Sequence, residues 1–145
     1  MMLEGITAVS LDRFVTAQEP TYESALAELR AGEKHGHWMW FIFPQIGGLG
    51  YSETAQFYAI SDLGEARDYL AHDLLGSRLI RCTQAVLAWE SRRSAEQIFG
   101  EVDAMKFASC MTLFEAAGGN VCFSLALDAF YEGKRDPLTL DLLGK

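Results

Sequence analysis

Apolar residues recur along most of the chain at the spacing of one face of an α-helix. In the segment after Pro20 they follow an i, i+3, i+4, i+7 pattern, at Tyr22, Ala25, Leu26 and Leu29. No segment shows a sustained alternation of apolar and polar residues, the pattern typical of a half-buried strand. The chain is therefore predicted to adopt an all-α fold of about eight helices.

Residues that favour helix ends stand at the borders of these segments. The predicted N-terminal caps are Ser10 or Asp12, Thr21, Ser52, Ser61 or Asp62, Asp73, Ser94, Asp103, Asn120 and Asp136. Glycines that permit a left-handed stop follow several helices, at Gly32, Gly100, Gly118 and Gly133. No repeat or linker-like segment divides the chain, so we predict a loosely ordered segment over residues 1–10 and one compact helical domain over residues 11–145.

One stretch, His35–Ser52, departs from the amphipathic pattern and reads HGHWMWFIFPQIGGLGYS. Its six consecutive apolar residues, 38–43, show neither the helical nor the strand period, so the segment is predicted to be buried, either extended or helical. Pro44 favours an extended Phe43, because a proline disfavours the α conformation in the residue before it. We interpret the segment as a buried extended or irregular connection that forms the floor or wall of a site.

Charge and cysteine usage narrow the class of protein. The chain carries 12 Lys and Arg against 20 Asp and Glu, a net charge of −8, and its basic residues are scattered. This disfavours duplex nucleic acid as a partner, although it leaves room for a local pocket for an anionic small molecule. The N-terminus lacks the features of a secretory signal, and the longest apolar run is too short to span a membrane. Three widely spaced cysteines, Cys82, Cys110 and Cys122, are typical of buried thiols in a reducing cytosol, so a cytoplasmic location is predicted.

Several short motifs resemble those of one protein family. They are Leu11-x-Arg13-Phe14, Ala17-Gln18, HWMWFIFPQ over residues 37–45, Gly48-Leu49-Gly50, Glu65-Ala66, Tyr69-Leu70, Leu75-Gly76-x-Arg78-Leu79, Phe99-Gly100, Asp103-x-x-Lys106, Met111-Thr112-Leu113-Phe114 and Gly133-x-x-Asp136. Over roughly positions 11 to 143 the chain resembles the family known as domain of unknown function 1810. The resemblance implies a mostly helical, single-domain protein without an established activity. Members are sometimes labelled calpastatin, but no segment of this chain resembles a calpain-inhibitor repeat.

The chain departs from the family pattern at two positions. Asp73 stands where proline is usual, and Cys110 stands where serine is usual, which weakens any catalytic role for a hydroxyl there. A fainter resemblance links the chain to the NADAR superfamily of NAD- and ADP-ribose-related glycohydrolases, through Glu65-Ala66, the helix with Arg78, and Lys106-Phe107. The late Trp-Gly motif of that superfamily is missing. This resemblance implies a ligand related to ADP-ribose.

Three residues are candidates for proton transfer. His37 has a side chain whose ordinary pKa of about 6.5 suits a general acid or base. His35 lies two residues earlier, but further metal ligands at a recognisable spacing are missing, and neither a metal site nor a cofactor is predicted. Asp103 and Lys106 lie three residues apart on a predicted helix, where they can act in catalysis or form a helix cap and an ion pair.

Four residues are candidates for substrate binding. In an extended segment Trp38 and Trp40 share one face and can stack on a planar ring; the alternative is that both belong to the core. The side-chain amide of Gln45 can orient a ligand as donor and acceptor. Arg78, three residues before Arg81 on one helix face, can bind a phosphate or carboxylate, unless both arginines are solvated or paired with acidic residues.

Two functional hypotheses follow from these residues. The first is an enzyme that binds a small molecule or nucleotide sugar and hydrolyses an N-glycosidic bond to ADP-ribose. In it Trp38, Trp40, Gln45 and Arg78 bind the substrate, and His37, Asp103 and Lys106 transfer protons. The second is a non-catalytic helical module whose aromatic segment is core and whose acidic surface binds a protein partner. Neither hypothesis involves a membrane.

Overall fold

The computed structural model describes residues 11–145, and the predicted loose segment 1–10 and the candidate cap Ser10 lie outside them. The helical elements are residues 11–18, α2 (Tyr22–Ala31), α3 (Met39–Ile42), α4 (Glu53–Phe57), α5 (Leu63–Ala71), α6 (Asp73–Leu87), α7 (Ala95–Phe99), α8 (Glu101–Ala116), α9 (Cys122–Tyr131) and α10 (Pro137–Leu142). In this part of the chain the only β-type pairing is a single bridge between Ile46 and Ile60. The predicted all-α fold is confirmed.

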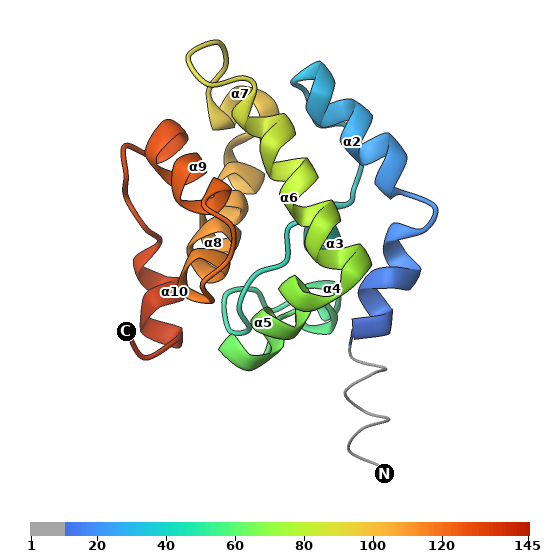
Figure 1. Cartoon of the computed structure of the whole chain (residues 1–145), viewed down its shortest axis with the longest axis vertical. Helices are drawn as coiled ribbons and strands as arrows, with labels where there is room; N and C mark the ends of the chain where they lie inside the picture. The colour runs from blue at the N-terminus through green and yellow to red at the C-terminus, as the bar shows by residue number, and fades with distance from the viewer. Residues whose placement is uncertain (1–10) are drawn as a thin grey trace.

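The two longest helices, α6 and α8, organise the packing of the others (Figure 1). α2 and α9 pack against α6, while α7, α9 and α10 pack against α8, and α5 contacts both long helices. α8 buries residues around most of its circumference, among them Phe107, Cys110 and Phe114. A helix that is apolar on nearly all sides must be surrounded by other elements, and α8 is accordingly the central one.

Most predicted helix ends are confirmed, since the expected side chains accept hydrogen bonds from free backbone N–H groups. The Ser52 hydroxyl accepts from the N–H of Ala55 at 3.1 Å, and the Asp62 carboxylate accepts from the N–H of Glu65 at 2.8 Å. Ser94 and Gln97 form the predicted capping box.

Three predicted caps are wrong by one to three residues. α6 is capped by His72, not Asp73, because His72 Nδ1 accepts from the N–H groups of Leu74 and Leu75, both at 3.2 Å. α8 starts after Gly100, so Asp103 lies in its first turn and is free to form ion pairs. Val121 is the cap residue of α9, although the preceding Asn120 accepts a hydrogen bond from the N–H of Cys122.

The aromatic segment is irregular except for the single helical turn α3, so the extended alternative is wrong. The turn is closed by the N–H of Ile42 donating to the Trp38 carbonyl at 3.1 Å and by that of Phe43 donating to the Met39 carbonyl at 3.0 Å. Met39, Ile42 and Phe43 therefore point inward together, whereas Trp40 stays partly exposed. Trp38 and Trp40 do not share a face.

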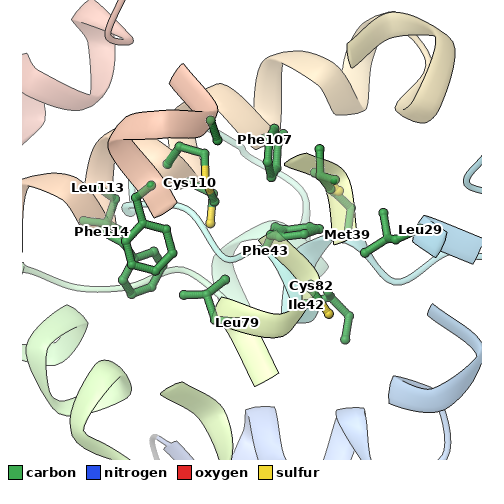
Figure 2. Close-up of a cluster of buried hydrophobic side chains, with 14 of the residues drawn as sticks. Leu29, Met39, Ile42, Phe43, Leu79, Cys82, Phe107, Cys110, Leu113 and Phe114 are labelled. Atoms are coloured by element: carbon green, nitrogen blue, oxygen red, sulfur yellow. The ribbon is translucent and has the colours of Figure 1, made fainter. Parts of the chain in front are cut away.

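Phe43 lies at the centre of the core (Figure 2). Its ring is fully buried and meets the ring of Phe107 edge-on, with centroids 4.9 Å apart, and the ring of Phe99 edge-on at 5.9 Å. Phe99 and Phe107 in turn stack on each other at 4.9 Å. This aromatic cluster joins the segment to α7 and α8, so the packing of the core depends on the conformation that buries Phe43.

Replacing Phe43 by alanine should lower the free energy of unfolding by about 3–5 kcal/mol, since the change leaves a cavity among the rings. Phe57→Ala is the matched control, because Phe57 is 59% exposed, and its substitution should change stability by about 0.5 kcal/mol or less. Urea unfolding followed by circular dichroism measures both values. Equal losses in the two variants would contradict the central place of Phe43.

Candidate functional site

A groove of about 800 Å³ lies between the segment after α3, the first half of α8 and the residues that follow α9. We call it the main groove; its lining residues include Trp40, Gln45, Leu49, Tyr51, Glu96, Val102, Met105, Lys106, Ser109, Tyr131, Glu132, Lys134, Arg135, Asp136 and Leu138. Of the predicted site residues, Trp40, Gln45 and Lys106 are brought together here.

Lys106 and Trp40 form one wall of the main groove. The Lys106 ammonium lies 5.0 Å from the centroid of the Trp40 ring, a cation–π contact, and 3.5 Å from one carboxylate oxygen of Asp103. Because Trp40 projects from the outer side of the α3 turn, its ring reaches the groove while its neighbours fill the core. A positive charge and an aromatic surface thus stand side by side.

Asp103 connects this wall to the aromatic segment through a second lysine. Its other oxygen lies 2.9 Å from the Lys34 ammonium, which sits 5.0 Å from the centroid of the Trp38 ring. The carboxylate is therefore shared by two lysines, each of which also contacts a tryptophan. The predicted ion pair between Asp103 and Lys106 is present, but Asp103 itself does not line the groove.

Gln45 faces the main groove with an unused side-chain amide. Its backbone carbonyl accepts a hydrogen bond from the N–H of Ile60 at 2.8 Å, which fixes the backbone next to the bridge at Ile46. Within residues 11–145 the side chain forms no hydrogen bond, and it is neither fully buried nor fully exposed. A free amide in this position can donate to one ligand atom and accept from another.

The remaining predicted site residues lie elsewhere. His37 is exposed and lines a separate hollow with Phe57 and Tyr58, which touches the main groove only at Trp40. Arg78 donates to the Gln18 side-chain oxygen at 3.4 Å and lies over the Tyr22 ring at 4.5 Å, so it does not reach the groove. Trp38 is only 1% exposed and belongs to the core.

One end of the main groove holds a polar cluster of residues that are not among the seven predicted site residues. One Asp136 carboxylate oxygen accepts from the Ser109 hydroxyl at 2.9 Å and from the Thr139 hydroxyl at 2.6 Å. Ser109 lies one turn after Lys106 on α8, and that spacing was a signal for its position on the groove wall. Asp136 was predicted as the cap of α10, which it also is, and as part of the motif Gly133-x-x-Asp136.

Arg135 is held beside this cluster by acidic neighbours. Its guanidinium donates two hydrogen bonds to Glu115, one of them at 2.8 Å, and one to Asp128 at 3.2 Å. Hydrogen bonds to Glu115 raise the pKa of Arg135 above its ordinary value, and Arg135 in turn lowers the pKa of Glu115. Lys134, in contrast, is exposed and has no ion pair within the described residues, so it is available to a ligand.

Neither a metal centre nor a reactive thiol emerges from the described residues. Within residues 11–145 no group of three or more His, Cys, Asp or Glu side chains is placed to hold a metal ion. Burial raises the pKa of the Cys82 thiol to about 12 and that of Cys122 to about 11, which disfavours the reactive thiolate. No helix in this part of the chain has both the length and the apolar character needed to cross a membrane.

A single carboxylate anchors the start of the aromatic segment. Glu28 on α2 accepts, through one oxygen, from the N–H of His35 at 2.7 Å, the N–H of Gly36 at 2.9 Å and the indole N–H of Trp38 at 3.0 Å. Burial acts to raise the pKa of Glu28, but the donors together outweigh it and hold the pKa below its ordinary value.

The chain matches a known family along nearly its whole length. The family model described as "Protein of unknown function (DUF1810)" matches residues 8–143. The chain is also similar to the crystal structure of the conserved hypothetical protein Rv1873 from Mycobacterium tuberculosis, with 51% sequence identity and a TM-score of 0.89, over 93% of this chain and 96% of that chain. No curated protein matches the chain. The resemblance to domain of unknown function 1810 is thereby confirmed.

Glu28→Gln should destabilise the protein at pH 7 by about 1–2 kcal/mol, because three donors lose a charged acceptor. A carboxylate whose pKa is lower in the folded state stabilises it above the unfolded pKa, and this stabilisation is lost as the pH falls through the folded pKa. The difference between wild type and Glu28→Gln should therefore shrink on acidification from pH 7 to pH 3. Urea unfolding at several pH values measures it; Glu90→Gln, at an exposed position, should show no such trend.

Proposed function

This chain belongs to the DUF1810 family, and we propose that it binds a small anionic ligand with a planar ring, of the nucleotide-sugar class, in the main groove. The observation that carries the proposal is the contact of Trp40 with Lys106 in a groove that Gln45, with its unused side-chain amide, also lines. Tryptophan offers a surface for a ring, lysine binds a phosphate, and the amide can read polar ring atoms. The volume of about 800 Å³ lies within the usual range for ligand sites, about 300–1,000 Å³.

The charges in the main groove suit a ligand with both phosphates and hydroxyl groups. Lys106 and Lys134 line the groove and can neutralise a diphosphate. Lys134 forms no ion pair within the described residues, and Lys106 forms one with Asp103 at 3.5 Å. Glu132 and Glu96, exposed on the same walls, can accept hydrogen bonds from ribose hydroxyls. The predicted resemblance to the NADAR superfamily makes ADP-ribose the first ligand to test, although of the residues that carry it only Lys106 lines the main groove.

The reaction we propose for such a ligand is hydrolysis of an N-glycosidic bond. Water attacks the anomeric carbon and gives a proton to a base while the bond to the ring nitrogen breaks. The departing base takes up a proton, unless its ring nitrogen is already cationic, as in NAD. Lys106 stands in the groove where it can donate that proton, with Asp103 holding its ammonium at 3.5 Å. His37 reaches the same ligand only past Trp40, from the neighbouring hollow, and serves there as the proposed base for water.

One observation favours the alternative, a module that binds a protein partner. Four large apolar side chains are exposed around the main groove, with exposed fractions of 85% for Tyr51, 66% for Val102, 72% for Met105 and 61% for Leu138. Exposed apolar residues gathered around a groove are typical of peptide-binding surfaces. A small ligand and a peptide would use different parts of this rim, and the variants below separate the two.

Lys106→Gln should weaken the binding of ADP-ribose at least tenfold, since the variant lacks the ammonium beside Trp40. Wild-type protein should show a saturable rise in melting temperature and a shift of the Trp40 indole N–H signal in NMR spectra. Lys145→Gln, at the exposed last residue, removes the same charge and should bind like the wild type. Binding that is unaffected by Lys106→Gln, or no binding of any nucleotide or sugar, would favour the protein-binding module.

If the ligand is cleaved, His37→Ala and Asp103→Asn should each lower the rate of release of the base at least a hundredfold. His37 is exposed, so its substitution should change the free energy of unfolding by about 0.5 kcal/mol or less, and a lost rate would not reflect unfolding. Chromatographic analysis of NAD and related N-glycosides measures the products. The exposed His35, replaced by alanine, is the matched control. Tight binding without cleavage would refute the hydrolase step and leave the binding site in place.

A further inference from the structure

We propose a second binding site for an anion: a surface groove between α2 and α6 that binds an oligophosphate chain, free or carried by a nucleotide. The groove has a volume of about 320 Å³, and we call it the arginine groove; its walls are formed by Arg30, Arg81, Gln84, Trp89 and Arg92. None of these residues lines the main groove, so the inference does not rest on the function proposed there.

Helical spacing brings the walls of the arginine groove together. One face of α6 and its C-terminal end carries Arg81, Gln84, Ala85 and Ala88. Arg92 reaches the groove from the turn that follows the helix, in which Ser91 has a left-handed backbone. Arg30 comes from the last turn of α2, which packs beside α6 (Figure 1). The two alanines between the arginines have short side chains, and this leaves the space that the groove occupies.

Trp89 holds the end of the arginine groove in place. Its indole N–H donates to the Leu29 carbonyl at 3.0 Å, which ties the chain after α6 to the end of α2. Gly32 packs so closely on this ring that an added Cβ would lie 2.7 Å from it. The Arg92 guanidinium lies 4.4 Å from the ring centroid, so one of the cations is positioned by a rigid neighbour.

The positive charge in the arginine groove has no counterpart in the described chain. Arg30, Arg81 and Arg92 form no ion pair within residues 11–145, although the whole chain has a net charge of −8. A further arginine flanks the groove, since the Arg93 guanidinium lies 5.5 Å from the Trp89 ring centroid. A concentration of unpaired guanidinium groups in an acidic protein indicates an external anion.

The positions of the arginines favour a chain of phosphates over a single one. Arg81 lies on α6 and Arg30 on α2, whereas Arg92 comes from the turn after α6, so guanidinium groups from three separate elements reach the groove. Guanidinium groups bind phosphate oxygens in pairs, and three of them suit three linked phosphates. The Trp89 ring is covered by Gly32 and Arg92, which leaves the phosphates as the recognised part and not a nucleotide base.

The test is an NMR titration of the full chain, labelled at the tryptophan indoles, with tripolyphosphate, ATP and orthophosphate. Tripolyphosphate should shift the Trp89 signal saturably, and this shift should persist in Lys106→Gln, in which any shift of the Trp40 signal by phosphates in the main groove should be lost. The double variant Arg30→Gln/Arg81→Gln should weaken this binding at least tenfold. The matched control is Arg67→Gln, at an exposed position of α5, which is compared with the single variant Arg81→Gln. Arg13 is not used in the control, because it is paired with Glu65.

The outcomes decide between a site and general attraction. Equal affinities for tripolyphosphate and ATP, or a tighter ATP complex, both support the site and identify which source of the phosphate chain it prefers. Equal weakening by Arg67→Gln and Arg81→Gln, the absence of saturation, or a shift at Trp40 in place of Trp89 would overturn it. Lys106→Gln should leave tripolyphosphate binding within twofold of wild type, so failure of the function proposed for the main groove would not affect this result.

Discussion

Burial of the aromatic segment through one helical turn is the constraint on which the rest of the structure depends. The turn α3 sends Met39, Ile42 and Phe43 into the core and leaves Trp40 on the outside. The segment is fixed at its start by Glu28, which accepts three N–H groups, and at its end by the Phe43 ring between α7 and α8. If the turn were shifted by one residue along the sequence, Trp40 would point into the core and a present core residue would point toward the groove.

Ion pairs of one carboxylate, that of Asp103, connect the core to the main groove. Asp103 lies in the first turn of α8 between Lys34, which covers Trp38, and Lys106, which faces Trp40. An acidic residue near a helix N-terminus is favoured by the helix dipole, so Asp103 both stabilises α8 and positions the two lysines. The contacts of Lys106 with Asp103 and Trp40 thus position its ammonium in the main groove and also stabilise the fold.

The helices were predictable from sequence because their signals are local. Ser52, Asp62 and Ser94 cap the helices that follow them, and the glycine after α2 ends it, since each acts within one turn. The conformation of residues 38–43 was not predictable, because a run of only apolar side chains carries no period. The pair of Asp103 with Lys106 followed from their spacing, but the contact of Lys106 with Trp40 depends on tertiary packing. For the same reason the placement of Arg78 and His37 away from the main groove had no local signal.

The most direct test of the central claim is a crystal structure of the protein with ADP-ribose at saturating concentration. The account predicts the ring of the ligand against Trp40, its diphosphate within reach of Lys106 and Lys134, and a polar atom hydrogen-bonded to the side-chain amide of Gln45. Trp38 and Phe43 should stay in the core, in the positions that α3 gives them. A ligand bound away from Trp40, or a main groove that stays empty while the ligand is bound elsewhere, would contradict it.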